Sequence, residues 1–211
     1  MSKSTNDNSQ LLDHIFEIVK SRGLKASTMD FVAHKLGISK RTLYEIFESK
    51  TEMLIKVLDH LLEKHRKFAQ RCIDTSPNVL VAFSRIFEGQ ARFLTDTNVS
   101  FISDMDSLYP ELRERYRYNA NTQEKDTLLL FERGVEEGVF VEGLNYRLLH
   151  LALTVQLESL KRMEERLADE LSLTQIFRII GMTFLRSIAT RKGLEMLEND
   201  AIIAPTVVKN N

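Results

Sequence analysis

The sequence is poor in the two residues that interrupt helices. Its 211 residues include only three prolines and eight glycines, whereas leucine, glutamate, lysine and arginine are abundant. Because proline and glycine are the least favourable residues in a helix interior, this composition predicts an all-α protein. The single cysteine, Cys72, excludes an intramolecular disulfide and fits a reducing compartment such as the cytosol.

Long apolar runs are also missing. No apolar segment follows a basic stretch near the amino terminus, so we expect no signal peptide. The most apolar stretch, residues 176–189, is too short to span a bilayer and contains Arg178 and Arg186. These absences predict a soluble, cytoplasmic protein with ample length for a hydrophobic core.

The residue spacings that common metal and catalytic sites require are absent as well. His60 and His65 do not have the i, i+4 spacing that places two imidazoles on one helix face. Asp104 and Asp106 lack the glycine and terminal glutamate of an EF-hand loop. Cys72 has no evident histidine partner, and no glycine-rich phosphate loop is present. We interpret these side chains as solvated surface and expect neither a cofactor nor an enzymatic activity.

The net charge of −1 conceals an uneven distribution. Residues 1–70 hold 12 Lys and Arg against 9 Asp and Glu, whereas the remaining residues hold 17 against 21. A mildly basic amino-terminal part beside an acidic remainder is typical of a protein with one local nucleic-acid surface. The imbalance is small, so this interpretation depends on the motif in the basic part.

Two short helical patterns occupy residues 27–50 and meet at Gly37. Ser27 or Thr28 can cap the start of the first helix. Gly37 can adopt the left-handed conformation that ends a helix sharply, and Ser39 is then placed to cap the second helix. The apolar positions of the first helix recur at helical spacing and are Phe31, Val32 and Leu36.

The second helix, residues 40–47, has an apolar side and a polar side. At about 100° per residue, three apolar side chains point toward a core and four polar side chains point away from it. Two helices joined by a short turn that contains glycine form a helix-turn-helix, whose second helix enters the major groove of DNA. The inward residues are Leu43, Ile46 and Phe47, and the outward residues are Arg41, Thr42, Tyr44 and Glu45.

The motif consists of residues 37–44 (GISKRTLY), then Phe47 and Ser49-Lys50, preceded by Val32-Ala33. It resembles the DNA-binding signature of the TetR family of bacterial repressors, over about residues 10–56. The family often has His or Tyr just before Phe47, whereas this sequence has Ile46. The resemblance implies an all-α protein with an N-terminal three-helix helix-turn-helix domain and a C-terminal helical domain for ligand binding and dimerisation.

The resemblance also implies that the partner is a double-stranded DNA operator, with one recognition helix per subunit in successive major grooves. Arg41 is the candidate base reader, because its guanidinium can address a guanine. Glu45 has two interpretations: it accepts from a cytosine amino group, or it only pairs with Arg41 across one helical turn. We expect the following side chains to contact phosphates: Thr28, Ser39, Lys40, Thr42, Tyr44 and Lys50.

Breaks in the helical patterns divide the chain. A polar segment up to residue 10 predicts a disordered arm. A capping-box sequence at residues 49–52 opens a long helix, which in the TetR family connects the DNA-binding domain to the body. The predicted divisions are 10–50 (helix-turn-helix domain), 51–71 (connecting helix), 77–192 (helical regulatory and dimerisation domain) and 193–211 (mobile tail).

The last two long helices, predicted over residues 147–167 and 173–191, are apolar around most of their circumference. A helix that is apolar all round must be covered on more than one side. We expect a second copy of the chain to supply that cover, so that the pair forms half of a four-helix homodimer interface. Gly181 costs about 1 kcal/mol relative to alanine in a helix interior, and a close helix–helix approach is a physical reason to keep it.

The body is rich in aromatic residues, which either line an apolar cavity for a small-molecule effector or fill the core. The resemblance implies such an effector without identifying it. The candidate ligand-binding residues are Phe87, Gln90, Phe101 and Arg117.

The sequence therefore predicts a homodimeric transcription regulator, most simply a repressor that a small-molecule effector releases from DNA. Two alternatives stay open. The regulator could be controlled by a protein partner instead, or the chain could be a dimeric helical binding module without operator recognition. Ile46 and the acidic Glu45 and Glu48 are the features that favour the second alternative.

Overall fold

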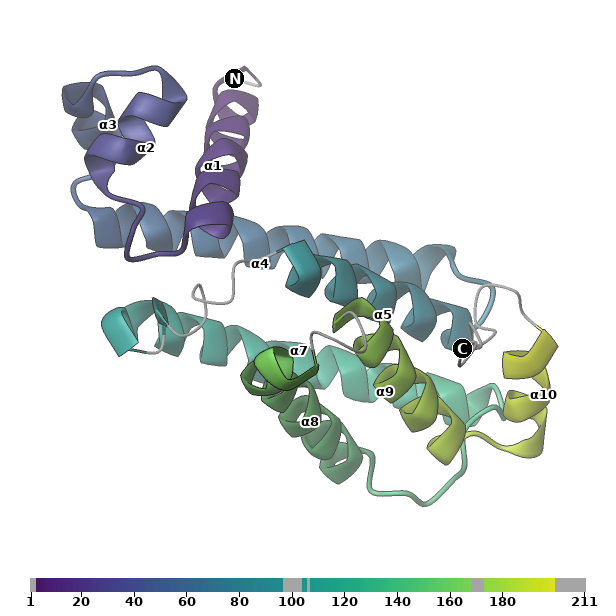
Figure 1. The fold of residues 1–211 in the computed structure, drawn as a ribbon. Coiled ribbons are helices and arrows are strands. Elements are labelled where there is room, and N and C mark those ends of the chain that lie inside the picture. Colours follow the sequence, from purple (N-terminus) through teal and green to yellow (C-terminus); the bar gives the residue numbers. More distant parts are fainter. Residues whose placement is uncertain (1–2, 97–103, 106, 168–172, 200–211) are drawn as a thin grey trace. The chain divides into compact units, whose positions relative to one another are not determined.

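The computed structural model describes residues 3–96, 104–105, 107–167 and 173–199. Most of these residues are helical, which confirms the predicted all-α class. No strand occurs among them apart from one isolated bridge. In the same ranges, none of the helices combines the length and the apolar character that a membrane span needs. The helices are α1 (Lys3–Arg22), α2 (Met29–Leu36), α3 (Lys40–Ile46), α4 (Lys50–Thr75), α5 (Val79–Asp96), α7 (Pro110–Glu136), α8 (Tyr146–Leu167), α9 (Leu173–Ile188) and α10 (Arg191–Asn199) (Figure 1).

The chain divides into two compact units, each made of two stretches. Residues 1–67 and 96–121 form the first unit, and residues 68–95 and 122–211 form the second. The division falls inside α4 and inside α7, so each of these helices belongs partly to both units. The first unit therefore contains more of the chain than the helix-turn-helix alone.

Within the first unit, α1, α2 and α3 lie together (Figure 1), and their buried side chains form a small apolar core. α2 has eight residues and α3 has seven, and helices this short are marginal on their own. Burial of one face of each helix therefore supplies most of their stability. The buried members of this core are Ile15 and Val19 of α1, Val32 and Ala33 of α2, Leu43 of α3, Phe47, and Met53 and Leu54 of α4.

α1 corrects the predicted disordered arm. The sequence predicts disorder up to residue 10, whereas the helix already begins at Lys3. The early segment contains neither proline nor glycine, so nothing in it stops a helix that the apolar face further along has nucleated.

α10 corrects the predicted mobile tail. Residues 193–199 lie in this helix, and Leu197 is fully buried. Gly193 allows the docking, because a Cβ there would collide with the carbonyl oxygen of Val139. Thr190, at the start of α10, also donates its N–H to Val139 O at 2.9 Å. Residues 200–211 lie outside the described part of the chain.

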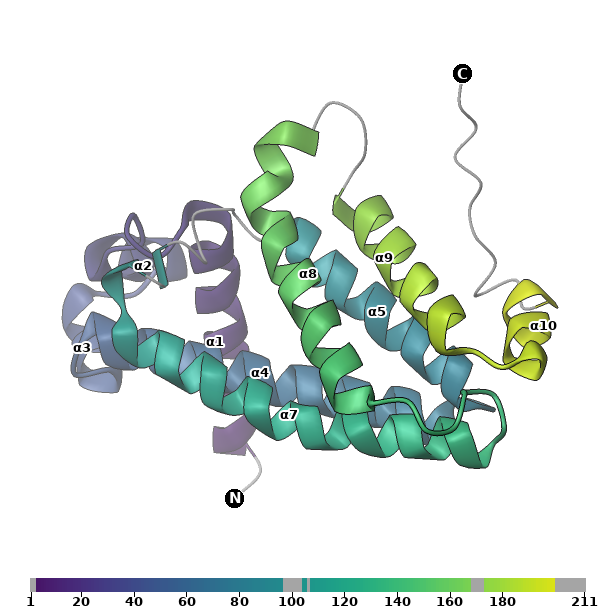
Figure 2. The same cartoon turned by 90° about the horizontal axis from the view of Figure 1, so that it is seen from below.

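The core of the second unit is built around aromatic side chains. Phe83 of α5 and Phe131 of α7 stack with ring centroids 5.1 Å apart, and Phe131 stacks on Tyr146 of α8 at 4.9 Å. Phe87 lies against Gly181 of α9, where an added Cβ would come within 3.2 Å of the ring. The close approach at Gly181 thus occurs within one chain, between α5 and α9, which lie side by side in Figure 2.

α8 and α9 also leave an apolar face exposed in the single chain. The two helices pack against each other (Figures 1 and 2). Along α8, Leu148, Leu151 and Val155 are each more than half exposed, and Ile179 of α9 is nearly so. One exposed leucine is ordinary, whereas a row at helical spacing is an uncovered face. This face belongs to the two helices over which the sequence predicts a second copy of the chain.

Candidate nucleic-acid interface

Local hydrogen bonds build the turn between α2 and α3. Gly37 has a φ of 70°, the left-handed conformation predicted for it, and its N–H faces the carbonyl oxygens of Ala33 and His34. Ser39 caps α3, because its hydroxyl accepts a hydrogen bond from the N–H of Thr42 at 3.0 Å. The helix-turn-helix therefore ends its first helix and starts its second at the residues that the sequence predicts.

Two buried side chains hold α3, and its polar side faces outward. Leu43 is fully buried, and Phe47 is buried where the chain leaves the helix. The side chain of Arg41 is 88% exposed and that of Glu45 is 62% exposed. Ile46 corrects the prediction that it points inward, since it is 37% exposed. It is the last residue of a short helix whose buried side consists of Leu43 and the adjoining Phe47.

Ion pairs occupy the charged side chains of α3 in the free protein. Arg41 Nε donates to Glu45 Oε1 at 3.0 Å, and Lys40 Nζ lies 2.8 Å from a carboxylate oxygen of Asp30 in α2. The hydrogen bond to Asp30 raises the pKa of Lys40 above its ordinary value. Exposed pairs of this kind contribute little to stability. DNA can therefore take the place of Glu45 as the partner of Arg41, or of Asp30 as the partner of Lys40. Arg41 is thus available for the predicted contact with a base.

The hydroxyl candidates take part in the helix caps. Thr28 caps α2, because its hydroxyl accepts from the N–H of Phe31 at 3.2 Å. The hydroxyls of Ser39 and Thr42 hydrogen-bond with each other at 2.8 Å. Tyr44 is exposed on the same helix as Thr42. Four predicted phosphate contacts therefore share α3 and its cap, namely Ser39, Lys40, Thr42 and Tyr44, whereas Thr28 begins α2.

Lys50 is the candidate that the structure separates from the others. Its Nζ donates to the backbone carbonyl oxygen of Lys25 at 3.2 Å and lies 5.6 Å from the centroid of the Tyr109 ring. An ammonium over an aromatic face is attracted to the ring electrons. Both contacts engage the ammonium within the first unit, so its predicted role as a phosphate contact has no support from its position.

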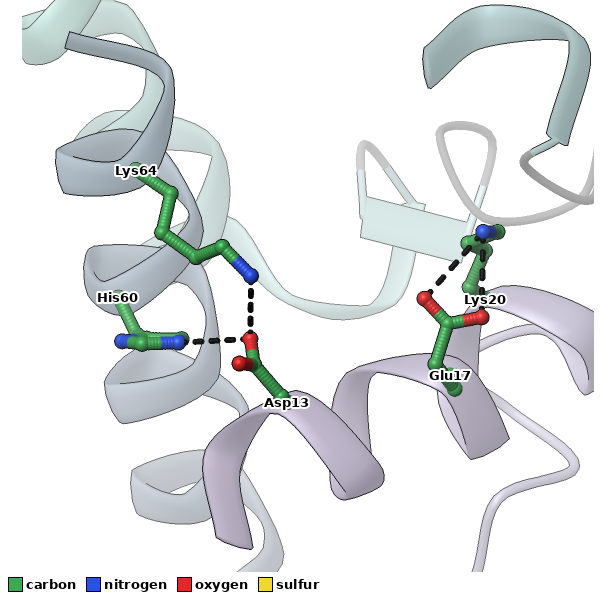
Figure 3. Close-up of polar contacts among 5 residues, drawn as sticks. All are labelled: Asp13, Glu17, Lys20, His60 and Lys64. Atoms are coloured by element: carbon green, nitrogen blue, oxygen red, sulfur yellow. Dashed lines mark hydrogen bonds and ion pairs between the residues drawn. The ribbon is translucent and has the colours of Figure 1, made fainter. Parts of the chain in front are cut away.

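Asp13 joins α1 to α4 through a cluster that sequence reasoning missed (Figure 3). Its Oδ1 accepts from Lys64 Nζ at 2.7 Å and lies 2.8 Å from Nε2 of His60. Glu17 and Lys20, further along α1, pair with each other at 3.2 Å. The i, i+4 spacing of His60 and Lys64, which places both on one face of α4, is the signal that could have predicted the cluster. His60 is therefore a half-buried partner of a carboxylate rather than solvated surface.

Acidification is expected to remove the contribution of Asp13 to stability. Partial burial alone would raise the pKa of Asp13, but hydrogen bonds from Lys64 and His60 outweigh it and hold the pKa below its ordinary value of 3.8. A carboxyl whose pKa is lowered in the folded state stabilises that state above the ordinary pKa and loses this effect as the pH falls through the folded value. We expect Asp13→Asn to reduce the unfolding free energy by less than about 1 kcal/mol near pH 7, because the pair is partly exposed.

The measurement is urea denaturation of wild type and Asp13→Asn near pH 7 and near pH 3. The difference between the two proteins should shrink at the lower pH, because the wild-type carboxyl loses its charge as the pH falls through its lowered pKa. An equal difference at both pH values would show that the side-chain charge is not responsible.

Three other residues interpreted as solvated surface are engaged in the fold. Cys72 is buried, and burial raises the pKa of its thiol. Burial, with a smaller effect of Lys64, lowers the pKa of His65. Asp104 accepts from the backbone N–H of Lys25 at 2.8 Å. Asp106 lies outside the described residues, and among those described no group of three potential metal ligands comes together.

The predicted ligand-binding residues are not gathered into one described site. Phe87 packs into the core of the second unit, and Gln90 is exposed on the same helix, α5. Arg117 belongs to the first unit, where it pairs with Glu114 at 3.4 Å. Phe101 lies outside the described residues.

The first unit also contains an open groove between α4 and α7. Its lining is mostly charged, and so it differs from the apolar cavity expected for a small effector. Arg115 and Asp59 bridge the two helices there with two hydrogen bonds of 2.6 and 2.8 Å. The groove is lined by Asp59, Leu62, Glu63, Arg66, Glu111, Glu114, Arg115, Tyr118 and Asn119.

Comparison with known proteins finds similarity to bacterial transcription regulators of the tetR family. The family model of the bacterial regulatory proteins of the tetR family matches residues 11–57. The HTH-type transcriptional repressor KstR2 of Rhodococcus jostii (strain RHA1) is 26% identical over 145 residues, which are 66% of this chain and 70% of that protein.

Solved structures share the fold over most of the chain. The TetR family transcriptional regulator PfmR from Thermus thermophilus has a TM-score of 0.63 and 24% identity, over 83% of this chain and 97% of that one. The transcriptional regulator FadR from Bacillus subtilis, solved in complex with stearoyl-CoA, has a TM-score of 0.63 and 16% identity, over 85% and 98%. At such identities these structures show the likeness of the fold.

Proposed function

Because the chain belongs to the TetR family of bacterial regulatory proteins, we propose that it is a ligand-responsive repressor that binds a palindromic operator as a homodimer. The chain is a DNA-binding transcription regulator, and one observation connects this function to particular residues. α3 presents Arg41 and Glu45 to solvent, while Leu43 and Phe47 anchor the opposite side of the helix. A helix held from one side with a polar free side fits a major groove.

The proposed roles follow the order of the chain. Residues 10–50 bind DNA, residues 51–71 connect, and residues 77–192 bind the effector and form the dimer. In the dimer, the two α3 helices contact successive major grooves, about 34–36 Å apart, and the two-fold axis requires a palindromic operator. The site of action is the bacterial cytoplasm, where the operator lies, and the proposal assigns the chain no catalytic activity.

The exposed apolar face of α8 and α9 supports the homodimer. Leu148, Leu151 and Val155 form a row along α8, and Ile179 adds to it from α9. A two-fold contact between identical faces would cover this row with its own copy, which is the usual arrangement of a symmetric dimer. Homodimer interfaces are more apolar than the rest of a protein surface, and this row of exposed apolar side chains fits that character.

A small-molecule effector is supported by the FadR structure, which contains stearoyl-CoA. This makes a long-chain acyl-CoA the first effector to test. An effector can release DNA only if it binds one arrangement of the two α3 helices more tightly than the other. The aromatic core of the second unit, around Phe83, Phe87 and Phe131, is the proposed location of the response.

The experiment is fluorescence anisotropy with duplex DNA from upstream of the protein's own gene, beside a scrambled duplex of the same length. We expect an operator dissociation constant of about 10 nM or lower at physiological salt, at least about 1,000-fold tighter than for the scrambled duplex. Affinity should fall steeply with salt for both duplexes, because lysine and arginine contacts to phosphates release counterions. Stearoyl-CoA should weaken binding to the operator duplex and leave binding to the scrambled duplex unchanged.

Each outcome separates the proposal from an alternative. Specific binding that no acyl-CoA weakens would favour control by a protein partner. Equal, weak and salt-sensitive binding to both duplexes would favour a dimeric module without operator recognition and would refute the repressor.

A further inference from the structure

The turn between α1 and α2, residues 23–28, leads into Thr28, the capping residue of α2. The turn is partly held by its own residues. Ser27 is fully buried, and its hydroxyl donates to the carbonyl oxygen of Gly23 at 2.8 Å. Lys25 lies between these two residues and is exposed. Its backbone has no helix or strand to hold it, so its position depends on other partners.

Two charged side chains from other parts of the first unit hold both backbone polar groups of Lys25. Asp104 Oδ2 accepts from the N–H of Lys25 at 2.8 Å. Lys50 Nζ donates to the carbonyl oxygen of the same residue at 3.2 Å. Hydrogen bonds in which one partner is charged are stronger than neutral ones. The exposed Lys25 is therefore held by hydrogen bonds at both its backbone N–H and its carbonyl oxygen.

The two side chains that hold Lys25, those of Asp104 and Lys50, belong to segments that are themselves held in place. Lys50 begins α4, and its ammonium lies over the ring of Tyr109, directly before α7. The N–H of Tyr109 donates to the carbonyl oxygen of Met105 at 3.3 Å, and Met105 is buried. Arg115 of α7 is joined to Asp59 of α4 by two hydrogen bonds. The segment that carries Asp104 is thus fixed to α4.

We propose that Asp104 and Lys50 are positioning residues for DNA binding. Their hydrogen bonds to the backbone of Lys25 fix the turn of residues 23–28, which presents Thr28. The proposal rests on DNA binding by this chain and assigns a role to a residue outside the matched residues 11–57. It also gives Lys50 a role other than contact with a phosphate. A turn that is ordered before DNA arrives loses less conformational freedom on binding, so the complex is tighter.

Positioning of Lys25 by Asp104 and Lys50 predicts effects of substitutions on DNA binding that differ from the effects of charge alone. Asp104 is an anion in the DNA-binding unit, so its removal should strengthen DNA binding if only overall electrostatics mattered. If Asp104 positions Lys25, its removal should weaken DNA binding. Lys50 provides a second distinction. A lysine that contacts a phosphate contributes about 0.9 to the slope of log affinity against log salt, whereas a positioning lysine leaves the slope unchanged.

The test combines operator affinity at several salt concentrations with amide hydrogen exchange of residues 23–28, both in the full chain. For Asp104→Ala we expect about 3- to 10-fold weaker binding, an unchanged salt slope and faster exchange of the Lys25 amide. Asp104→Asn keeps an oxygen that accepts and should stay within about 2-fold of wild type. Lys50→Met should weaken binding with the same slope as wild type.

Glu111→Ala is the matched control, because it removes an exposed carboxylate from the first turn of α7 without touching Lys25. It should not weaken binding. Unchanged or tighter binding by Asp104→Ala would overturn the proposal, as would a salt slope lowered by about 0.9 per subunit in Lys50→Met. Unchanged exchange of the Lys25 amide in Asp104→Ala would overturn it even if no operator were found. Failure of wild type to prefer any operator would instead refute the proposed repressor.

Discussion

Replacing Arg41 by alanine is expected to weaken operator binding about 30-fold or more, with a much smaller effect on unrelated DNA. A bidentate arginine–guanine pair discriminates by about 1–3 kcal/mol, and a two-fold operator would lose two such pairs. Each 1.4 kcal/mol is about a factor of ten in affinity. The side chain is 88% exposed, so its removal should not disturb the fold. The measurement is anisotropy with operator and scrambled duplexes.

The matched control for Arg41→Ala is Arg66→Ala, which removes another exposed arginine that pairs with a glutamate of its own helix, Glu63. It should change operator affinity by less than about 2-fold, because the residue lies outside the helix-turn-helix. An equal loss in both variants would show that net charge, and not base reading, is responsible.

Glu45→Ala separates the two interpretations of Glu45. Loss of preference at one base pair would support contact with cytosine, and unchanged or tighter binding would support simple pairing with Arg41.

Replacing Leu148 by aspartate is expected to raise the dissociation constant of the dimer at least about 100-fold and to abolish operator binding with it. Covering a leucine contributes about 1.5–3 kcal/mol, and a two-fold interface contains each residue twice. Aspartate is tolerated by the chain itself, because position 148 lies in the first turn of α8, where a carboxylate suits the helix dipole. Sedimentation over a range of concentrations measures the dimer, and circular dichroism checks the fold.

Leu129→Asp provides the control for the dimer variant. Leu129 is 62% exposed on α7, against 60% for Leu148 on α8, so the two substitutions remove the same side chain at the same exposure. Leu129→Asp should leave both the dimer and the operator complex unchanged. A dimer that survives Leu148→Asp, or equal dissociation of both variants, would move the interface away from α8 and α9.

The parts of the structure that the sequence predicts well depend on local chemistry. The left-handed conformation of Gly37 and the caps at Thr28 and Ser39 each follow from the residue itself and its nearest neighbours. The polar side of α3 follows from helical periodicity alone. Leu43 and Phe47 are buried for the same reason. The helix-turn-helix could therefore be placed without any knowledge of tertiary contacts.

The parts that the sequence does not predict depend on contacts between distant residues. The sequence predicts Lys50 at a phosphate, whereas in the structure its ammonium lies over Tyr109, which is far away along the chain. Asp104 shows no motif, and its role exists only because folding brings it to the amide of Lys25. α10 docks because Gly193 lacks a Cβ beside Val139, which periodicity within the tail cannot reveal. Propensity and spacing describe neighbours, whereas these features arise from packing.

The division of the first unit into two stretches also affects how the protein folds while it is being made. The ribosome delivers residues 1–67 first, then residues 68–95 of the other unit, and only then residues 96–121. During that interval α1, α2 and α3 rely on their own small core, because Asp104 and Arg115 have not yet been synthesised. Domains generally fold as units during synthesis. Here the helix-turn-helix is made before residues 68–95, yet its unit is complete only after residue 121 has been translated.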